Sequence, residues 1–362
     1  MDIPMDAPRS RVRLDRIAQL VLAAAAVALF VTMVPRGALI DALHLVRATG
    51  PRLALVLLPF AVAVLFDSAA QAVLFSRLGR KAAIHVAAQA RLASEAIALS
   101  TPGGGVLGEP VAALVLARRG NIPPGESVAV AAARRVLLMR VHAAWIVSGA
   151  LAGWSLLAAR SHDLLGSRWL PWLILASALL PLMAATGVDL AFASGSLAGK
   201  VLGGLTRIVP AKIKAYLRKG EAQALVVDGS AKSLLRSGVR ALLVPALLFG
   251  GVWVAESCEA YLIIHLLGGS TPFVHVMAIE ASASILRAIA FFAPAGIGVQ
   301  DMGYLALLSG GDPRTAAVAT GFVIVKRGRE ALTIAMGLVT LALSARRTRS
   351  TRAAGSLDAG ER

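Results

Sequence analysis

Long hydrophobic runs separated by short polar stretches dominate this chain of 362 residues. An α-helix rises ~1.5 Å per residue, so a run of about 20 apolar residues crosses a hydrocarbon core of ~30 Å. Six runs approach or exceed this length, at 17–34, 53–75, 128–158, 169–194, 240–268 and 314–344. We therefore predict six transmembrane helices.

Two further apolar segments, 84–117 and 273–308, are broken near their middles by proline and glycine. Half of either segment is too short to cross the core, so each is predicted to form a re-entrant helical hairpin. Broken backbone at this depth is tolerated only where protein or water surrounds it. The hairpin turns are predicted at Pro102, Gly103, Gly104 and Gly105, and at Pro294, Gly296 and Gly298.

The two broken segments share one pattern, and the corresponding positions lie 192 residues apart. The first copy has Glu95-Ala-Ile-Ala-Leu99, then Pro102, Gly104, Glu109 and the basic pair Arg134-Arg135. The second has Arg287-Ala-Ile-Ala-Phe291, then Pro294, Gly296, Asp301 and the basic pair Lys326-Arg327. We interpret this as an internal duplication, with repeat 1 at about 51–158 and repeat 2 at about 240–344.

The distribution of Lys and Arg predicts the orientation. With both termini in the cytoplasm, 23 of the 37 Lys and Arg residues lie on the cytoplasmic side and 6 lie outside, in agreement with the positive-inside rule. An odd number of crossings then separates the two hairpins, so the copies form an inverted repeat. The predicted fold is all-α, a polytopic membrane helical bundle with six transmembrane helices and two re-entrant hairpins.

The domain organisation follows from the same reading. We predict a basic cytoplasmic leader at 1–16 and a single transmembrane domain at 17–345, whose first span is an uncleaved signal anchor. A basic cytoplasmic segment is predicted at about 199–238, and a disordered cytoplasmic tail at 346–362.

Composition narrows the class of protein. Hydrophobic residues make up 57% of the chain and its mean hydropathy is +0.74, far above the values of soluble domains. The net charge of +17 comes from clusters that flank apolar runs without stacking aromatics, so a membrane surface is expected as partner and nucleic acid is not. The single cysteine, Cys258, permits no intramolecular disulfide and no CxxC site. We expect no cofactor and no metal.

Charged residues inside the apolar segments are the candidate chemistry. Each costs ~2.5–3.5 kcal/mol if it faces lipid, so these groups must be paired or hydrated. The cations are Arg91, Arg134, Arg135, Arg140, Arg287, Lys326, Arg327 and Arg329, and the carboxylates are Asp67, Glu95, Glu109, Glu256, Glu259, Glu280, Asp301 and Glu330. They form either a substrate pathway or ion pairs that only hold the bundle together.

Two sets of residues receive specific predictions. The basic pairs Arg134-Arg135 and Lys326-Arg327 are predicted to contact a lipid headgroup, because guanidinium and ammonium groups bind phosphate. Glu109 and Asp301 are predicted in the first turn after each break, where a carboxylate either caps the helix through its dipole or carries a coupling proton. Glu95 is a third candidate for coupling, and no catalytic residue is assigned.

Two short motifs carry a family resemblance. Ser100-Thr-Pro-Gly-Gly-Gly-Val-Leu-Gly-Glu109, with Ala117-Arg-Arg-Gly120, and Ala293-Pro-Ala-Gly-Ile-Gly-Val-Gln-Asp301 resemble the paired motifs of the lysylphosphatidylglycerol synthase transmembrane, or flippase-like, family. That family includes membrane proteins encoded with hopanoid-biosynthesis genes, and the resemblance covers about 15–345. The chain departs from the pattern at Ala295, where glycine is common, and at Asp301, where glutamate is common.

The resemblance implies movement of lipid between leaflets. In bifunctional members a soluble aminoacyl-transferase domain follows the membrane part, but only 18 residues follow Ser344 here, so aminoacylation of phosphatidylglycerol is not expected.

We therefore expect a lipid flippase or transporter of the bacterial inner membrane, which moves a phospholipid, polyprenyl or hopanoid-type lipid and is not an enzyme. Its expected partners are membrane lipids with an anionic headgroup and, as further candidates, lipid-biosynthesis enzymes. The alternatives are an integral-membrane lipid-modifying enzyme that uses Glu109 or Asp301 as general base, and an accessory scaffold subunit of a lipid-synthesis complex.

Overall fold

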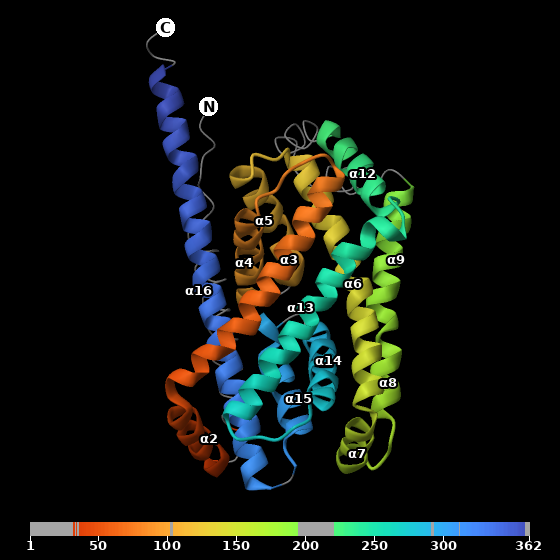
Figure 1. Cartoon of the computed structure of the whole chain (residues 1–362), viewed down its shortest axis with the longest axis vertical. Coiled ribbons are helices and arrows are strands. Elements are labelled where there is room, and N and C mark those ends of the chain that lie inside the picture. The colour runs from red at the N-terminus through yellow and green to blue at the C-terminus, as the bar shows by residue number, and fades with distance from the viewer. Residues whose placement is uncertain are drawn as a thin grey trace, which may run out of the picture.

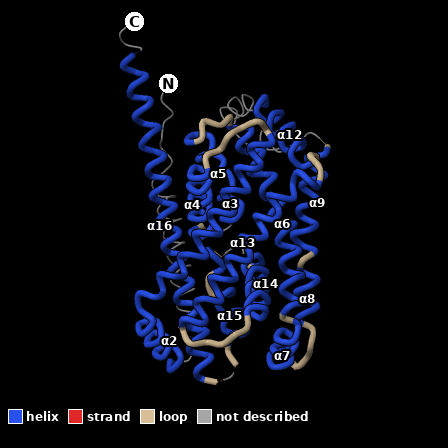
Figure 2. Tube along the Cα trace, viewed as in Figure 1, coloured by secondary structure: helices blue, strands red, loops and turns tan. Residues whose placement is uncertain are grey.

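The computed structural model describes Thr32, Val34 and residues 36–101, 104–194, 221–290, 293–310 and 312–358 (Figure 1). All regular elements in these ranges are helices, as predicted, and Figure 2 shows them joined by short loops. Several predicted features lie outside the described residues: the leader 1–16, nearly all of the span 17–34, Pro102, Gly103, and the part of the basic segment between 199 and 220.

The first half of the chain forms four long helices and two shorter elements. They are α2 (Arg36–Thr49), the 3₁₀ helix η1 (Gly50–Val56), α3 (Leu57–Arg77), α4 (Ile84–Ser100), α5 (Gly104–Arg119) and α6 (Pro124–Ala152). The chain bends between α2 and α3 (Figure 1). Gly50 has a positive φ of 51° and Pro51 lacks a backbone N–H, so a regular α-helix does not continue through this point.

The middle of the chain connects the two halves. It contains α7 (Trp154–Leu165), α8 (Leu170–Ser177), α9 (Leu179–Ala193) and α12 (Glu221–Leu235). The predicted span 128–158 is therefore α6 followed by the start of α7, because α6 ends at Gly153. The predicted outer loop 159–168 is largely helical, since α7 runs through it to Leu165.

The second half repeats the order of the first. It contains α13 (Val239–Leu266), α14 (Phe273–Ile289), the 3₁₀ turn η2 (Pro294–Gly296), α15 (Val299–Leu308) and α16 (Pro313–Asp358). The tail expected to be disordered instead continues α16 as far as Asp358. Residues 346–358 contain no proline and include arginine, alanine and leucine, which are good helix formers, so an already formed helix can extend through them.

Four helical runs among the described residues are long and apolar enough to cross a membrane: Arg36–Arg77, Pro124–Ala152, Leu170–Ala193 and Val239–Leu266. They contain or overlap four of the six predicted spans. The predicted span 314–344 lies in α16, which carries charged residues near the middle of its apolar part. The protein is thus a multi-pass membrane protein.

The helices of the two halves pack on one another in a reciprocal way. α3 packs along α13, α4 packs on α16, and α14 packs on α6. Figure 1 shows α4 and α5 in the upper half of the view and α14 and α15 in the lower half. The hairpin of α4 and α5 therefore packs on α16, which follows the second hairpin. The hairpin of α14 and α15 packs on α6, which follows the first.

Glycine permits the closest of these contacts. A Cβ on Gly149 of α6 would lie 2.8 Å from Cβ of Ala281 in α14. A Cβ on Gly337 of α16 would overlap the carbonyl oxygen of Leu92 and Cβ of Ala96 in α4. Small residues at such positions allow helix backbones to approach closely, which is how membrane helices gain packing energy.

Polarity is distributed as in a membrane protein. Large apolar side chains such as Leu180 and Met183 of α9 are exposed, whereas Asp67, Glu259 and Lys326 are buried. The bundle therefore presents apolar surface outward and keeps charge inside, where it must be compensated.

Candidate functional site

In the first hairpin, α5 is a continuous helix from Gly104, and glycines allow it to pack closely on α4. A Cβ on Gly104 would lie 2.5 Å and 2.6 Å from the carbonyl oxygens of Ile97 and Ala98, and one on Gly108 would lie 2.6 Å from that of Ser94. The two helices can pack this tightly only because these positions are glycine. The predicted turn residues Gly104 and Gly105 thus form the first turn of α5.

The second hairpin turns differently. Ala295, Gly296 and Gly298 all have positive φ, at 52°, 64° and 87°. This backbone cannot continue as a right-handed helix, so α15 begins only at Val299. Ala295 adopts the left-handed conformation that favours glycine, which gives a physical reason for glycine at this position of the motif.

The two turns place the candidate carboxylates at different points. Asp301 lies in the first turn of α15, as predicted, and its Oδ2 accepts a hydrogen bond of 3.0 Å from the backbone N–H of Gly298. Glu109 does not lie in the first turn of its helix, because α5 starts five residues earlier, at Gly104. The predicted placement of Glu109 in a first turn is therefore wrong. Its carboxylate pairs with Arg134.

Asp67 of α3 is the most completely compensated carboxylate. It is fully buried and accepts hydrogen bonds from Arg134 Nε at 2.9 Å and Nη2 at 2.5 Å, from Gln71 Nε2 at 2.9 Å, and from Arg91. Arg134 also donates through Nη1 to Glu109 Oε1 at 2.7 Å. One guanidinium thus joins α3, α5 and α6, and this geometry rigidly defines where the first hairpin sits.

Arg91 and Arg329 extend these contacts to α13 and α16. Arg91 Nε donates to Glu95 Oε2 at 3.1 Å, and its Nη2 lies 3.8 Å from Glu256 Oε1. Arg329 Nε donates to Glu259 Oε1 at 2.9 Å, and its Nη1 lies 3.7 Å from Glu95 Oε1. We call this set the first ion cluster: Asp67, Arg91, Glu95, Glu109, Arg134, Glu256, Glu259 and Arg329.

The second hairpin has a cluster of its own. Arg327 donates to Asp301 Oδ1 through Nε at 2.9 Å and Nη2 at 2.6 Å, and to Glu330 at 2.5 Å. Arg287 lies 3.3 Å from Glu330 Oε1 and donates to Gln300 at 2.9 Å. We call Arg287, Asp301, Arg327 and Glu330 the second ion cluster.

A separate buried pair lies beside the second cluster. Lys326 Nζ is 2.7 Å from Glu280 Oε1, and the Tyr304 hydroxyl donates to Glu280 Oε2 at 3.2 Å. The ammonium also lies over the rings of Tyr304 and Phe322, at 5.0 Å and 5.5 Å from their centroids. These contacts replace the water that Lys326 loses on burial.

The four predicted headgroup cations therefore fall into two groups. Arg134 and Lys326 are buried, and Arg327 is mostly buried. Each of the three forms an ion pair with a carboxylate of the protein. Arg135 is exposed and makes no hydrogen bond or ion pair with any described residue. Arg140 pairs with Asp189 of α9, away from both clusters.

Part of the charged region reaches the surface between α6, α13 and α14. His142 of α6 bonds Ser284 of α14 through Nε2 at 2.8 Å and stacks on Trp253 of α13 with ring centroids 4.3 Å apart. Arg135 and Arg287 both lie within electrostatic range of this histidine. The Arg287 side chain is 41% exposed and that of Glu256 is 31% exposed. We call Arg135, His142, Glu256 and Arg287 the open face.

Sequence reasoning named Asp67 and Glu259 only among the possible partners of the intramembrane cations and gave neither a specific role, although both belong to the first ion cluster. They occupy corresponding positions on α3 and α13, 192 residues apart, which is the spacing of the duplication. That spacing was the signal that could have found them.

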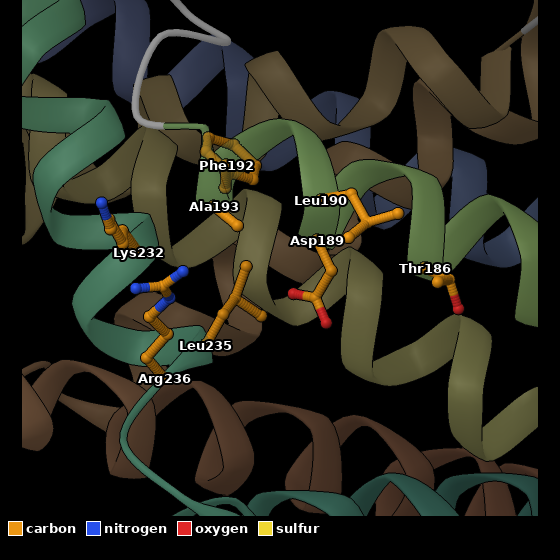
Figure 3. A pocket seen from close by; sticks show the side chains of 8 residues that line it. All are labelled: Thr186, Asp189, Leu190, Phe192, Ala193, Lys232, Leu235 and Arg236. Carbon is orange, nitrogen blue, oxygen red and sulfur yellow. The ribbon is translucent and has the colours of Figure 1, made fainter.

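A cavity of about 200 Å³ lies elsewhere, between α9 and α12 (Figure 3). Asp189, Leu190 and Phe192 line it from α9, Lys232 from α12, and Arg236 from the turn that follows α12. None of the predicted site residues lines this cavity. Within the described ranges, no group of three or more His, Cys, Asp or Glu side chains could hold a metal ion.

Comparison with known proteins identifies one family. The family described as lysylphosphatidylglycerol synthase TM region matches residues 16–337. None of the curated proteins or solved structures compared with the chain matches it.

Proposed function

The chain belongs to the family of the lysylphosphatidylglycerol synthase transmembrane region, and on this premise we propose that it is a lipid flippase or lipid transporter. It moves a phospholipid, polyprenyl or hopanoid-type lipid between the leaflets of the bacterial inner membrane and does not modify it covalently. The observation that carries the proposal is the arrangement of the intramembrane charges. Both hairpins contribute to neighbouring ion clusters, and Glu256 and Arg287 of these clusters are partly exposed at the open face.

The proposed fold behind this function is an inverted repeat of two hairpin units, with six spans and both termini in the cytoplasm. The reciprocal packing of α4 on α16 and of α14 on α6 supports it, as does the placement of the hairpins in opposite halves of the bundle (Figure 1). Inverted repeats place a site near the midplane and suit alternating access, because either half can rock about the site.

The ion pairs modify the role of the predicted headgroup cations. Removing either partner of a buried ion pair leaves an uncompensated charge and costs about 3–5 kcal/mol, so Arg134, Lys326 and Arg327 act by holding the helices around the path. Arg135 has no such partner among the described residues. We assign to Arg135 the contact with an anionic headgroup, with Arg287 beside it on the open face, while the acyl chains stay in the bilayer.

Exchange of fluorescent phosphatidylglycerol between leaflets of proteoliposomes tests the proposal. Arg134 and Arg135 provide a matched pair of variants, since they are neighbours on one helix and differ in burial. Arg135→Gln should lose most exchange with an unchanged melting temperature. Arg134→Gln should instead lower the melting temperature, because Asp67 and Glu109 lose their shared donor.

Three outcomes oppose the proposal. Full exchange by the Arg135→Gln protein would remove this residue from the path. A covalently changed lipid, detected by mass spectrometry, would favour the lipid-modifying enzyme. Absence of exchange by the wild type with phosphatidylglycerol, polyprenyl phosphate and hopanoid lipids alike would favour a scaffold subunit.

A further inference from the structure

The first ion cluster holds more negative than positive charge. It contains three arginines and five carboxylates among the described residues. The second ion cluster, by contrast, pairs two arginines with two carboxylates, and Lys326 pairs with Glu280 alone. Among these groups, the surplus of carboxylate therefore lies in the first ion cluster, and two of its five carboxylates belong to α13.

Glu256 is the least compensated member of the cluster. Its nearest cation is Arg91 Nη2 at 3.8 Å, beyond hydrogen-bond distance, and Arg91 is already bound to Asp67 and Glu95. Glu256 accepts no hydrogen bond from any described residue. A partly buried carboxylate without such a bond loses hydration that no donor replaces, and this favours uptake of a proton.

Glu259 provides the contrast, three residues further along the same helix. Its Oε1 accepts the 2.9 Å bond from Arg329, so this carboxylate has a cation in direct contact. Its Oε2 is buried and has no hydrogen-bond partner among the described residues. The two carboxylates lie on one face of α13, so a negative charge on Glu259 adds to the reasons for Glu256 to be neutral.

Charged groups on four described helices act on Glu256. Arg91 and Glu95 face it from α4, Arg287 from α14, Arg329 from α16, and Glu259 from its own helix. Each of the three arginines makes its shorter contact with another carboxylate: Arg91 with Asp67, Arg287 with Glu330, and Arg329 with Glu259. These cations therefore compensate Glu256 only from longer range than they compensate its neighbours.

We propose that Glu256 is a proton-binding site, which takes up a proton from the open face and releases it there. Its partial exposure makes the carboxylate accessible to protons. The excess negative charge of the first ion cluster favours proton binding there. The coupling of this proton to lipid rests on the proposed function. Proton uptake removes a negative charge that acts on Arg287 of the open face, so an anionic headgroup binds the protonated form and leaves with a proton.

Infrared spectroscopy of the full chain in phosphatidylcholine nanodiscs tests the proton site without reference to transport. The wild type should show the carbonyl band of a protonated carboxylic acid, which disappears as the pH rises and shifts in D₂O. Glu256→Gln should remove the part of the band that corresponds to one carboxyl group. Glu259→Gln is the matched control, which should keep that band while lowering the melting temperature. If the Gln variant fails to accumulate, Glu256→Asp keeps the carboxyl and should shift the band in frequency.

Contrary outcomes are equally specific. A band that persists unchanged in Glu256→Gln, or that does not shift in Glu256→Asp, places the proton elsewhere. No pH-dependent band in the wild type removes the proton site. A band abolished by sodium ions at constant pH identifies a sodium site instead.

Leaflet exchange under a pH gradient then tests the coupling. If one proton accompanies each anionic lipid, a gradient of one pH unit biases the labelled lipid up to about tenfold in the wild type. The bias should vanish in Glu256→Gln. An infrared band at Glu256 without any lipid exchange would refute the proposed function and leave the proton site standing. Exchange that ignores the gradient would refute the coupling alone.

Discussion

Lys326 and Glu280 form the buried ion pair whose energetics can be tested most cleanly. Both side chains are almost fully buried, their charged atoms are 2.7 Å apart, and neither makes an ion pair with any other described residue. Lys326→Met keeps the length of the side chain and removes the charge. Glu280 then keeps only the Tyr304 hydroxyl as a donor.

The expected loss for Lys326→Met is about 3–5 kcal/mol in the free energy of unfolding, the cost of stranding one partner of a buried pair. Glu280→Gln should lose a comparable amount, because it strands the ammonium. The double variant should recover to within ~1–2 kcal/mol of the wild type, since no buried charge is left and the Gln oxygen still accepts from Tyr304.

Unfolding of the purified protein by SDS in mixed micelles measures all four states of this double-mutant cycle. The reasoning is refuted if the two single losses simply add in the double variant, because the side chains would then not compensate each other. It is also refuted if Lys326→Met loses lipid exchange at unchanged stability. That result would indicate that Lys326 contacts the lipid headgroup and does not merely stabilise the packing of the helices.

Three further predictions concern the second turn, the start of α16 and the topology. Ala295→Gly should raise the free energy of unfolding by about 1 kcal/mol, because it relieves a left-handed alanine, and an unchanged or lower value in the SDS titration would contradict this. Hydrogen bonds from Thr315 lower the pKa of Asp312 below its ordinary value of 3.8. Asp312→Ala should therefore lower the melting temperature at pH values above 3.8. The difference from the wild type should shrink as the pH falls below 3.8, because the wild-type carboxyl then becomes protonated. In a Cys258→Ala background, the cysteine of Asp163→Cys in α7 should react with a membrane-impermeant maleimide from the periplasm and that of Leu225→Cys in α12 should not; labelling of both from one side would contradict the inverted topology.

The sequence determined the helices and the breaks between them. Apolar length predicted the four helical runs of the described residues that are long enough to span a membrane, because a helix satisfies its own backbone hydrogen bonds within lipid. The Pro/Gly breaks fixed the two hairpins, and the 192-residue spacing linked their corresponding positions. The presence of charges inside apolar segments also required a compensated interior, since lipid does not tolerate them.

The first feature that only the tertiary structure decided is the backbone geometry of the two hairpin turns. The same motif offered Glu109 and Asp301 as equivalent caps, yet only Asp301 lies in the first turn of its helix. The reason is the series of positive φ angles at Ala295, Gly296 and Gly298, which delays α15 and has no described counterpart in the first hairpin. Glycine letters permit such a turn without requiring it.

The second feature that only the tertiary structure decided is which charged side chains form ion pairs with each other. Arg134 and Arg135 are adjacent and chemically identical, but one is buried between Asp67 and Glu109 and the other is exposed. Successive residues point about 100° apart around a helix, so the sequence establishes that the two arginines differ in direction. Which direction faces the core depends on how α3, α5 and α6 pack together, and packing joins residues far apart in the chain. For that reason the sequence alone could supply the charged groups of the candidate site, whereas only the tertiary structure separated those that are buried in ion pairs from those that are exposed.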